Sequence, residues 1–143
     1  MERKAEADAL DDAQRWLNSA KRDGSSGDYN LGIYGLEMSV EIALKAVLIF
    51  LGIDYPKVHD ILPVVRMAIK ENKSRLPKSF VENESFILDT FKDLLKLRGP
   101  AGYTFGSNVK IMDLEEDYKK YLGDATKILE LCKTAITVSK KRY

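Results

Sequence analysis

Residues 28–51 set the strongest limit on the fold, because a helix over this segment is apolar on nearly every face. A helix with so narrow a polar side is surrounded by other helices, so the segment predicts the central helix of a bundle. Asp28 is placed to cap its start, and Gly52 stands where a left-handed residue commonly ends a helix. Its apolar residues are Leu31, Ile33, Leu36, Val40, Ile42, Leu44, Val47, Leu48 and Phe50.

Four further segments show the spacing of three and four residues that is typical of amphipathic helices. These segments are residues 3–22, 60–72, 81–98 and 113–139. Short connections between successive helices make neighbours antiparallel. We therefore expect an all-α, up-and-down antiparallel bundle of about five helices, forming a single domain over residues 1–143.

Glycine, proline and capping residues predict where these helices begin and end. Residues 23–27, Asp-Gly-Ser-Ser-Gly, are expected to form a short loop, and Gly99-Pro100 is expected to end the fourth helix sharply. Residues 99–112 would then be the longest irregular segment. Asp113, with Glu116 three residues later, predicts a capping box at the start of the last helix.

Charge and cysteine content exclude several classes of function. The chain has 23 Lys and Arg against 22 Asp and Glu, so no overall field draws it to nucleic acid or anionic lipid. One cysteine, Cys132, and one histidine cannot build a disulfide or a structural zinc site. Cys132 lies on an apolar helix face and is expected to be buried and inert.

Neither the N-terminus nor any apolar run resembles a targeting or membrane-spanning segment, so we expect a cytoplasmic protein without membrane contact. The sequence also lacks a phosphate-binding Gly-rich loop, a metal-spaced pair of histidines and a Cys-x-x-Cys motif. It therefore predicts neither a metal nor a cofactor.

Three charged residues interrupt the apolar central segment. Glu37, Glu41 and Lys45 recur every four residues and therefore form one stripe along a helix. The simplest interpretation is that Glu41 and Lys45 pair on a narrow solvent face, with a gain of about 0.2–0.5 kcal/mol. Because an unpaired buried charge is costly, the other interpretation is that the stripe meets a partner charge or lines a cleft.

The order of several residues resembles the HEPN domain (higher eukaryotes and prokaryotes nucleotide-binding domain), of the type associated with MNT nucleotidyltransferases. These residues are Tyr29, the segment Glu41-Ile-Ala-Leu-Lys45-Ala46, His59 before the third helix, and Arg98 at the end of the fourth. The resemblance covers almost the whole chain. It implies a helical bundle that forms homodimers and works beside a small MNT-type nucleotidyltransferase, in a toxin–antitoxin-like pair.

Ribonuclease members of the family use an Arg-x4-6-His motif after the fourth helix, assisted by Glu-x3-Lys/Arg in the second, and need no metal. Arg98 matches the arginine of the first motif, and Glu41 with Lys45 matches the second. The histidine is missing, because Tyr103 to Phe105 occupy its allowed positions. A histidine exchanges protons near neutral pH whereas an ordinary tyrosine does not, so the departure argues against cleavage.

Arg98-Gly99-Pro100 also resembles the Arg-x-Pro of family members thought to bind nucleotides without cutting RNA. Arg98 would then offer two N–H groups to a phosphate, with Lys45 as a second cation, and aromatic residues of the following loop would stack on a base. The structural alternative is that Arg98 caps its own helix end and the aromatic residues close the bundle. His59 is expected to be a structural residue that caps or flanks the third helix.

The sequence thus favours a nucleotide- or RNA-binding module over two alternatives, a metal-independent endoribonuclease with a degenerate Arg-x4-Tyr motif and a non-catalytic adaptor bundle. All depend on one spatial expectation, namely that Arg98 and the Glu41–Lys45 pair converge on a shared, water-filled groove. The candidate binding residues are Arg98, Lys45, Glu41, Glu37, Tyr103 and Phe105.

Overall fold

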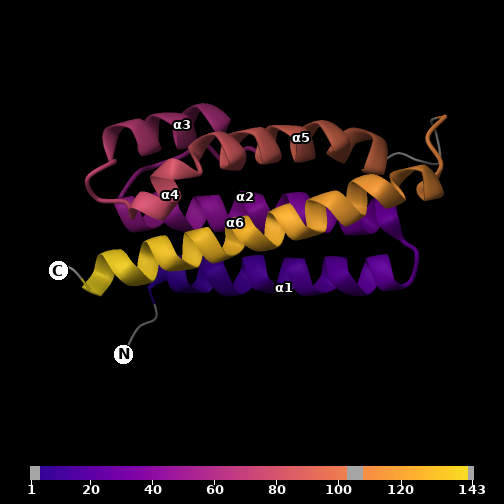
Figure 1. Cartoon of the computed structure of the whole chain (residues 1–143), viewed down its shortest axis with the longest axis horizontal. Helices are drawn as coiled ribbons and strands as arrows, with labels where there is room; N and C mark the ends of the chain where they lie inside the picture. The colour runs from indigo at the N-terminus through magenta and orange to yellow at the C-terminus, as the bar shows by residue number, and fades with distance from the viewer. Residues whose placement is uncertain (1–3, 103–107, 142–143) are drawn as a thin grey trace.

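The computed structural model describes residues 4–102 and 108–141, and over these ranges it consists of helices without a strand (Figure 1). The helices are α1 (Ala5–Ser25), α2 (Tyr29–Leu51), α3 (Leu62–Glu71), α4 (Lys78–Glu82), α5 (Glu84–Gly102), the 3-10 helix η2 (Ile111–Leu114) and α6 (Glu115–Lys141). The all-α prediction is confirmed. No helix within the described ranges is long and apolar enough to cross a membrane.

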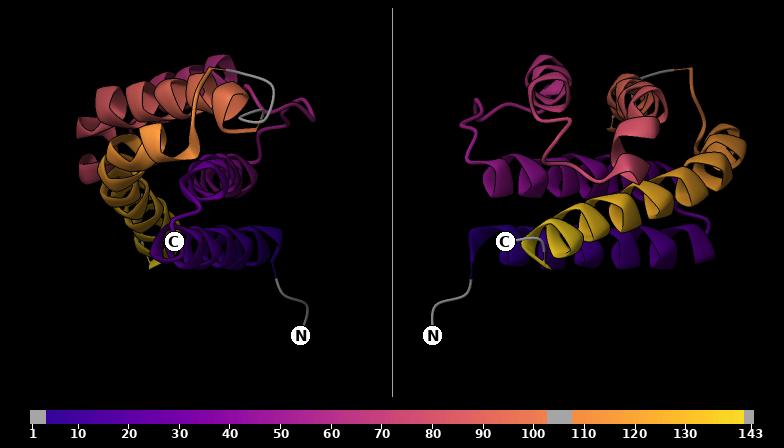
Figure 2. Two further views of the ribbon diagram at one scale, coloured as in Figure 1. Left: turned by 90° about the vertical axis from the view of Figure 1, so that its right-hand side faces the viewer. Right: turned by 60° about the vertical axis from the view of Figure 1, so that its left-hand side comes forward.

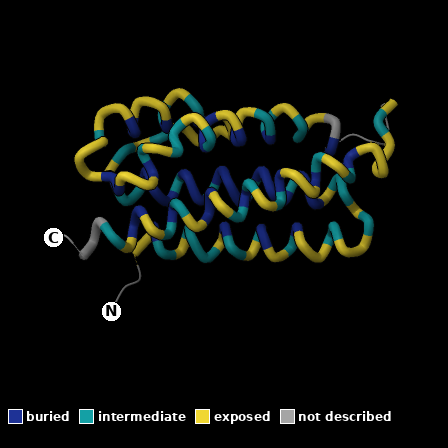
Figure 3. The backbone as a smooth tube through the Cα atoms, viewed as in Figure 1, coloured by how far each residue is buried: buried dark blue, intermediate teal, exposed yellow. Residues whose placement is uncertain are grey.

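Helix α2 lies at the centre of the bundle, as its apolar sequence predicts. It contacts α1, α5 and α6 most extensively, and Figure 3 shows it as the most continuously buried element. The predicted end of this helix is confirmed, since Gly52 adopts a left-handed φ of 75°. The predicted cap at its start is wrong in one respect, because the side chain of Asp28 makes no capping hydrogen bond.

The four long helices alternate in direction, and α6 crosses the bundle obliquely (Figures 1 and 2). The short helices α3 and α4 lie in the connection between α2 and α5, at the end of the bundle where α1 begins and α6 ends. The prediction of an up-and-down bundle with a shorter helix attached is therefore confirmed.

Helix α1 extends beyond its predicted end, through Gly24 to Ser25. A Cβ atom on Gly24 would lie 2.0 Å from the ring of Tyr118, and one on Gly32 would lie 2.7 Å from the same ring. The Tyr118 hydroxyl donates a hydrogen bond to the Ala20 carbonyl at 3.0 Å. Gly24 is thus needed for close packing, and the chain turns only at Gly27, where φ is 79°.

The predicted helix over residues 81–98 is in fact two helices, α4 and α5, separated at Asn83. Helix α5 then continues through Gly99 and Pro100, so the expectation that these residues end it is wrong. Ala101, which is 2% exposed, holds the extra turn against the core. Arg98 consequently lies inside the helix instead of at its end.

The last helix also begins differently from the prediction. Residues Ile111–Leu114 form the 3-10 helix η2, and the Asp113 carboxylate accepts a hydrogen bond from the Lys110 N–H at 3.0 Å. Asp113 therefore closes the turn before α6 and does not cap α6 itself. Residues Tyr103 and Phe105, predicted to stack on a base, lie outside the described residues.

Candidate functional site

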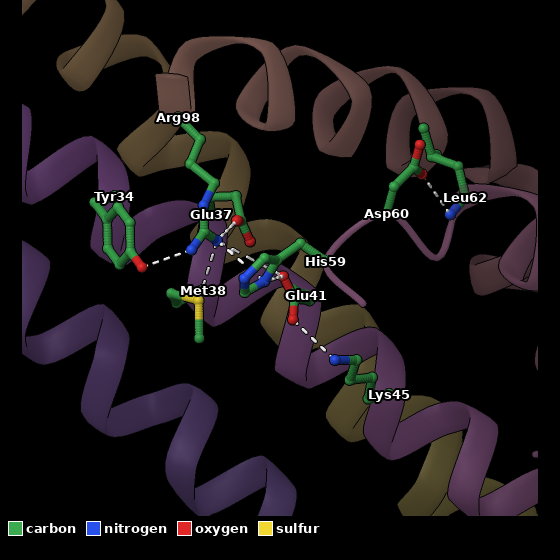
Figure 4. A network of polar contacts seen from close by, with 9 residues as sticks. All are labelled: Tyr34, Glu37, Met38, Glu41, Lys45, His59, Asp60, Leu62 and Arg98. Carbon is green, nitrogen blue, oxygen red and sulfur yellow. Dashed lines mark hydrogen bonds and ion pairs between the residues drawn. The ribbon is translucent and has the colours of Figure 1, made fainter. Parts of the chain in front are cut away.

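Helices α2 and α5 and the connection before α3 bring five ionisable side chains together (Figure 4). We call this group the charged cluster. Glu37, Glu41 and Lys45 lie along one side of α2, because residues four apart share a helix face. Arg98 reaches them from α5, and His59 reaches them from the connection between α2 and α3. The cluster consists of Glu37, Glu41, Lys45, His59 and Arg98.

Arg98 contacts only α2 and the connection that follows it, as far as its described contacts show. Its guanidinium donates a hydrogen bond to the Glu37 Oε1 atom and another to the Tyr34 hydroxyl, the second at 2.5 Å. It also lies 4.3 Å from the centre of the Tyr34 ring and 4.0 Å from Glu41 Oε1. The alternative that Arg98 caps its own helix end is therefore wrong.

Glu41 connects the other members of the cluster. One of its oxygens accepts a hydrogen bond from Lys45 Nζ, and the other lies near His59 Nδ1, both at 2.9 Å. The Glu41 side chain is only 3% exposed and that of Lys45 is 17% exposed. The predicted pair thus exists, but the interpretation that places it on a solvent face is wrong.

The contacts of His59 determine where its ring carries a proton. His59 Nδ1 lies 2.9 Å from a Glu41 oxygen and 3.2 Å from an Arg98 nitrogen, which always carries its protons. Nδ1 cannot donate to Glu41 and accept from Arg98 at once. The shorter distance and the charge of Glu41 favour an Nδ1–H donated to Glu41. Nε2 then remains available to a ligand.

Glu37 is fully buried, and its Oε2 atom has no hydrogen-bond partner among the described residues. Burial and, to a smaller extent, the neighbouring Glu41 raise the pKa of Glu37 to about 8 against the opposing effect of Arg98. Burial also opposes ionisation of Glu41. Hydrogen bonds with Glu37, Lys45 and His59 nevertheless hold the pKa of Glu41 below its usual value. At neutral pH the proton of this pair therefore belongs to Glu37.

This distribution of protons makes the cluster positive. With Glu37 neutral, the single negative charge of Glu41 faces the two positive charges of Lys45 and Arg98. Burial opposes the charge on Arg98, but its hydrogen bond with Glu37 raises the pKa of the guanidinium. A cluster with this excess charge attracts anions.

Oxygen and nitrogen atoms of Glu37, Glu41 and His59 lie within 4.8 Å of one another and could in principle ligate a metal ion. Two observations oppose a cation there. The Arg98 guanidinium lies beside all three side chains, and Glu37 is protonated at neutral pH. These residues do not fit a metal centre.

A cavity of about 630 Å³ opens beside the charged cluster, at the end of α2. Lys45 and His59 line it, whereas Arg98 and Glu37 do not. This cavity is therefore not the predicted shared groove, because Arg98 does not line it. The other lining residues are Ile49, Gly52, Ile53, Asp54, Tyr55, Lys57 and Val58.

Comparison of the sequence with models of protein families identifies the family of this chain. A family model described as the HEPN domain matches residues 7–135, which include all five members of the cluster. The chain belongs to the HEPN domain family. No curated protein matches it significantly.

Four of the six residues predicted for the HEPN site, Glu37, Glu41, Lys45 and Arg98, do converge. The sequence interpretation missed Tyr34 and underestimated His59, which flanks α3 as expected but also contacts Glu41 and Arg98. Tyr34 could have been found, because it precedes Glu37 by three residues and so shares its helix face.

Proposed function

We propose that this HEPN domain binds nucleotides or RNA, with phosphate held on the open side of the charged cluster. The observation that supports this most directly is that Lys45 and His59, which belong to the cluster, also line the cavity. Lys45 Nζ has three N–H groups, of which one donates to Glu41, so others remain for a phosphate oxygen. Arg98 does not line the cavity, but it adds positive charge to the cluster next to it.

Stability is a weak explanation for such a cluster. Taking charges out of water costs several kcal/mol per ion, and apolar residues of similar volume often pack equally well or better. Charged residues inside an otherwise apolar helix are therefore better explained by a ligand. The positive excess at neutral pH selects an anionic one.

Removing the charge of Lys45 tests this proposal. Lys45→Met keeps most of the side-chain length, and we expect it to weaken binding of a labelled single-stranded RNA about tenfold in a fluorescence anisotropy titration. The control is Lys92→Met, which removes an equal charge from an exposed position on α5. Equal affinities for both variants would contradict the proposal.

His59 favours a second candidate, the metal-independent ribonuclease. The Glu41–His59 contact through Nδ1 orients the ring as in other carboxylate–histidine pairs, and His59 lines the cavity. Nε2 would accept the proton of an RNA 2′-hydroxyl as its oxygen attacks the adjacent phosphorus. Protonated His59 would return that proton to the departing 5′-oxygen, and Arg98 would stabilise the negative charge.

Incubation with RNA in the presence of EDTA tests this candidate. Cleavage should be lost in His59→Gln, which keeps much of the shape and polarity of the ring but cannot transfer protons in this way. RNA binding should persist in that variant. Cleavage that continues in both His59→Gln and Arg98→Lys would exclude this site, and no cleavage by the unaltered protein would exclude the ribonuclease altogether.

We also propose that the domain forms a homodimer and works with a small MNT-type nucleotidyltransferase in a toxin–antitoxin-like pair. Membership of the HEPN family supports this proposal. Sedimentation velocity of the purified chain tests the dimer. Copurification with a nucleotidyltransferase encoded by an adjacent reading frame tests the partner, and the absence of such a frame would count against it.

A further inference from the structure

We propose that the cavity beside the charged cluster holds one ribonucleotide unit, with its phosphate toward Lys45 and its base against Tyr55. This inference rests on the proposed function and extends it, because it says which part of a ligand lies outside the cluster. The cavity is formed by the end of α2 and the connection to α3, and none of the residues predicted from the α5 end of the site lines it.

Two of the lining residues, Lys45 and His59, also belong to the charged cluster, so this side of the cavity joins the cluster. Lys45 carries a positive charge there, and Lys57 adds a second ammonium group to the lining. Lys57 is exposed and, unlike Lys45, has no carboxylate partner among its described contacts. A phosphate group matches this side, since its oxygens accept several hydrogen bonds and carry the opposite charge.

The remaining lining is suited to a base. Tyr55 is half-buried, and the centre of its ring lies 5.4 Å from Lys45 Nζ, so the aromatic ring adjoins the phosphate side directly. Ile49, Ile53 and Val58 add apolar surface. Stacking of a base on an aromatic ring contributes about 1–3 kcal/mol and tolerates any base.

Asp54 is the single carboxylate in the lining and favours a ribose over a deoxyribose. A carboxylate accepts hydrogen bonds from sugar hydroxyls, as acidic residues do in dinucleotide sites. The volume of about 630 Å³ lies within the range of small-molecule sites, which is roughly 300–1,000 Å³. A single nucleotide unit therefore fits, either as a free nucleotide or as the end of an RNA strand.

Calorimetric titration of the intact chain provides the first test. Adenosine 5′-monophosphate is the probe, and adenosine, inorganic phosphate and deoxyadenosine 5′-monophosphate are the comparisons. We expect each comparison ligand to bind at least tenfold more weakly than the ribonucleotide. Equal affinity of inorganic phosphate and the ribonucleotide would overturn the proposal, because the base and sugar would then contribute nothing.

Variants of the cavity provide the second test. Tyr55→Leu and Lys57→Met should each weaken ribonucleotide binding about tenfold, whereas Tyr55→Phe and the control Lys92→Met should retain it. Circular dichroism confirms that each variant is folded. Unchanged affinity in both Tyr55→Leu and Lys57→Met would overturn the proposal.

The two proposals fail in different ways. If Lys45→Met weakens RNA binding but the cavity variants leave nucleotide binding unchanged, the proposed function stands and this inference fails. If neither RNA nor any nucleotide binds the unaltered chain, both fail. A trinucleotide with a 5′-phosphate distinguishes the two sources of the ligand, since only a strand-end site binds it as tightly as the free nucleotide.

Discussion

At the scale of single residues, the surroundings of Glu37 strongly oppose its ionisation. It is buried between Arg98 and Glu41, and its pKa is raised to about 8. The unfolded chain loses this proton near pH 4.5, so between these values the folded state binds more protons than the unfolded state. The contribution of Glu37 to the free energy of unfolding is therefore fully present below pH 4.5, and it is lost as the pH rises through about 8.

Glu37→Gln tests this ionisation. Glutamine resembles the protonated carboxyl, so the variant should lack the loss of unfolding free energy that the unaltered protein shows as the pH rises from 5 to 9. Each unit by which folding raises the pKa corresponds to about 1.4 kcal/mol of unfolding free energy. The unaltered protein should therefore lose several kcal/mol of unfolding free energy across this range. Urea unfolding of both proteins across this range measures the difference. Parallel pH profiles would contradict it.

The residues of the site were predictable to different degrees. Glu37, Glu41 and Lys45 follow from helical spacing alone, and Arg98 follows from the order of motifs in the family resemblance. The role of His59 could not be read from spacing, because its contact with Glu41 depends on the path of the connection between α2 and α3. A local pattern does not specify that path.

At the scale of helices, the clearest difference between prediction and structure is the role of Gly24. Glycine often follows a helix end, and the sequence therefore predicted a loop. The structure uses the missing Cβ instead, since Tyr118 packs against Gly24 and Gly32. Contacts between residues almost a hundred positions apart are invisible to a helical pattern. The same reason explains α5, where burial of Ala101 extends a helix past Gly99-Pro100.

Gly24→Ala should destabilise the domain by about 1–3 kcal/mol, because the new methyl group overlaps the buried ring of Tyr118. Gly123→Ala is the matched control. Gly123 lies within α6, and a Cβ there meets no atom within 4 Å, so the change should stabilise by about 0.5–1 kcal/mol. Urea midpoints of the two variants should therefore move in opposite directions. A shift in the same direction would contradict the packing of Tyr118.

At the scale of the whole molecule, apolar periodicity was sufficient to predict the bundle, because each long helix buries the face that its sequence marks as apolar. The position of the cavity was not predictable. The sequence suggested a groove shared by Arg98 and the Glu41–Lys45 pair, whereas the cavity opens only toward Lys45 and His59. Its walls depend on how the segment after α2 folds back, which is again a tertiary property.

The charge of the cluster should make ligand binding depend on pH. Below about pH 8, the positive charges of Lys45 and Arg98 outnumber the single negative charge of Glu41. As the pH rises through about 8, Glu37 loses its proton and its negative charge cancels this excess. Affinity for single-stranded RNA should then fall severalfold between pH 7 and pH 9 at constant ionic strength. Glu37→Gln should remove most of this dependence. An identical fall in Glu37→Gln would assign it to another group.

The most direct test of the account uses the only histidine of the chain, His59, whose ring gives an unambiguous NMR signal. Nitrogen-15 spectra of the imidazole should show an Nδ1–H held by Glu41 and an Nε2 signal that shifts when a nucleoside monophosphate or RNA is added. Ring signals that stay unchanged at saturating ligand would contradict the claim that phosphate binds at this cluster.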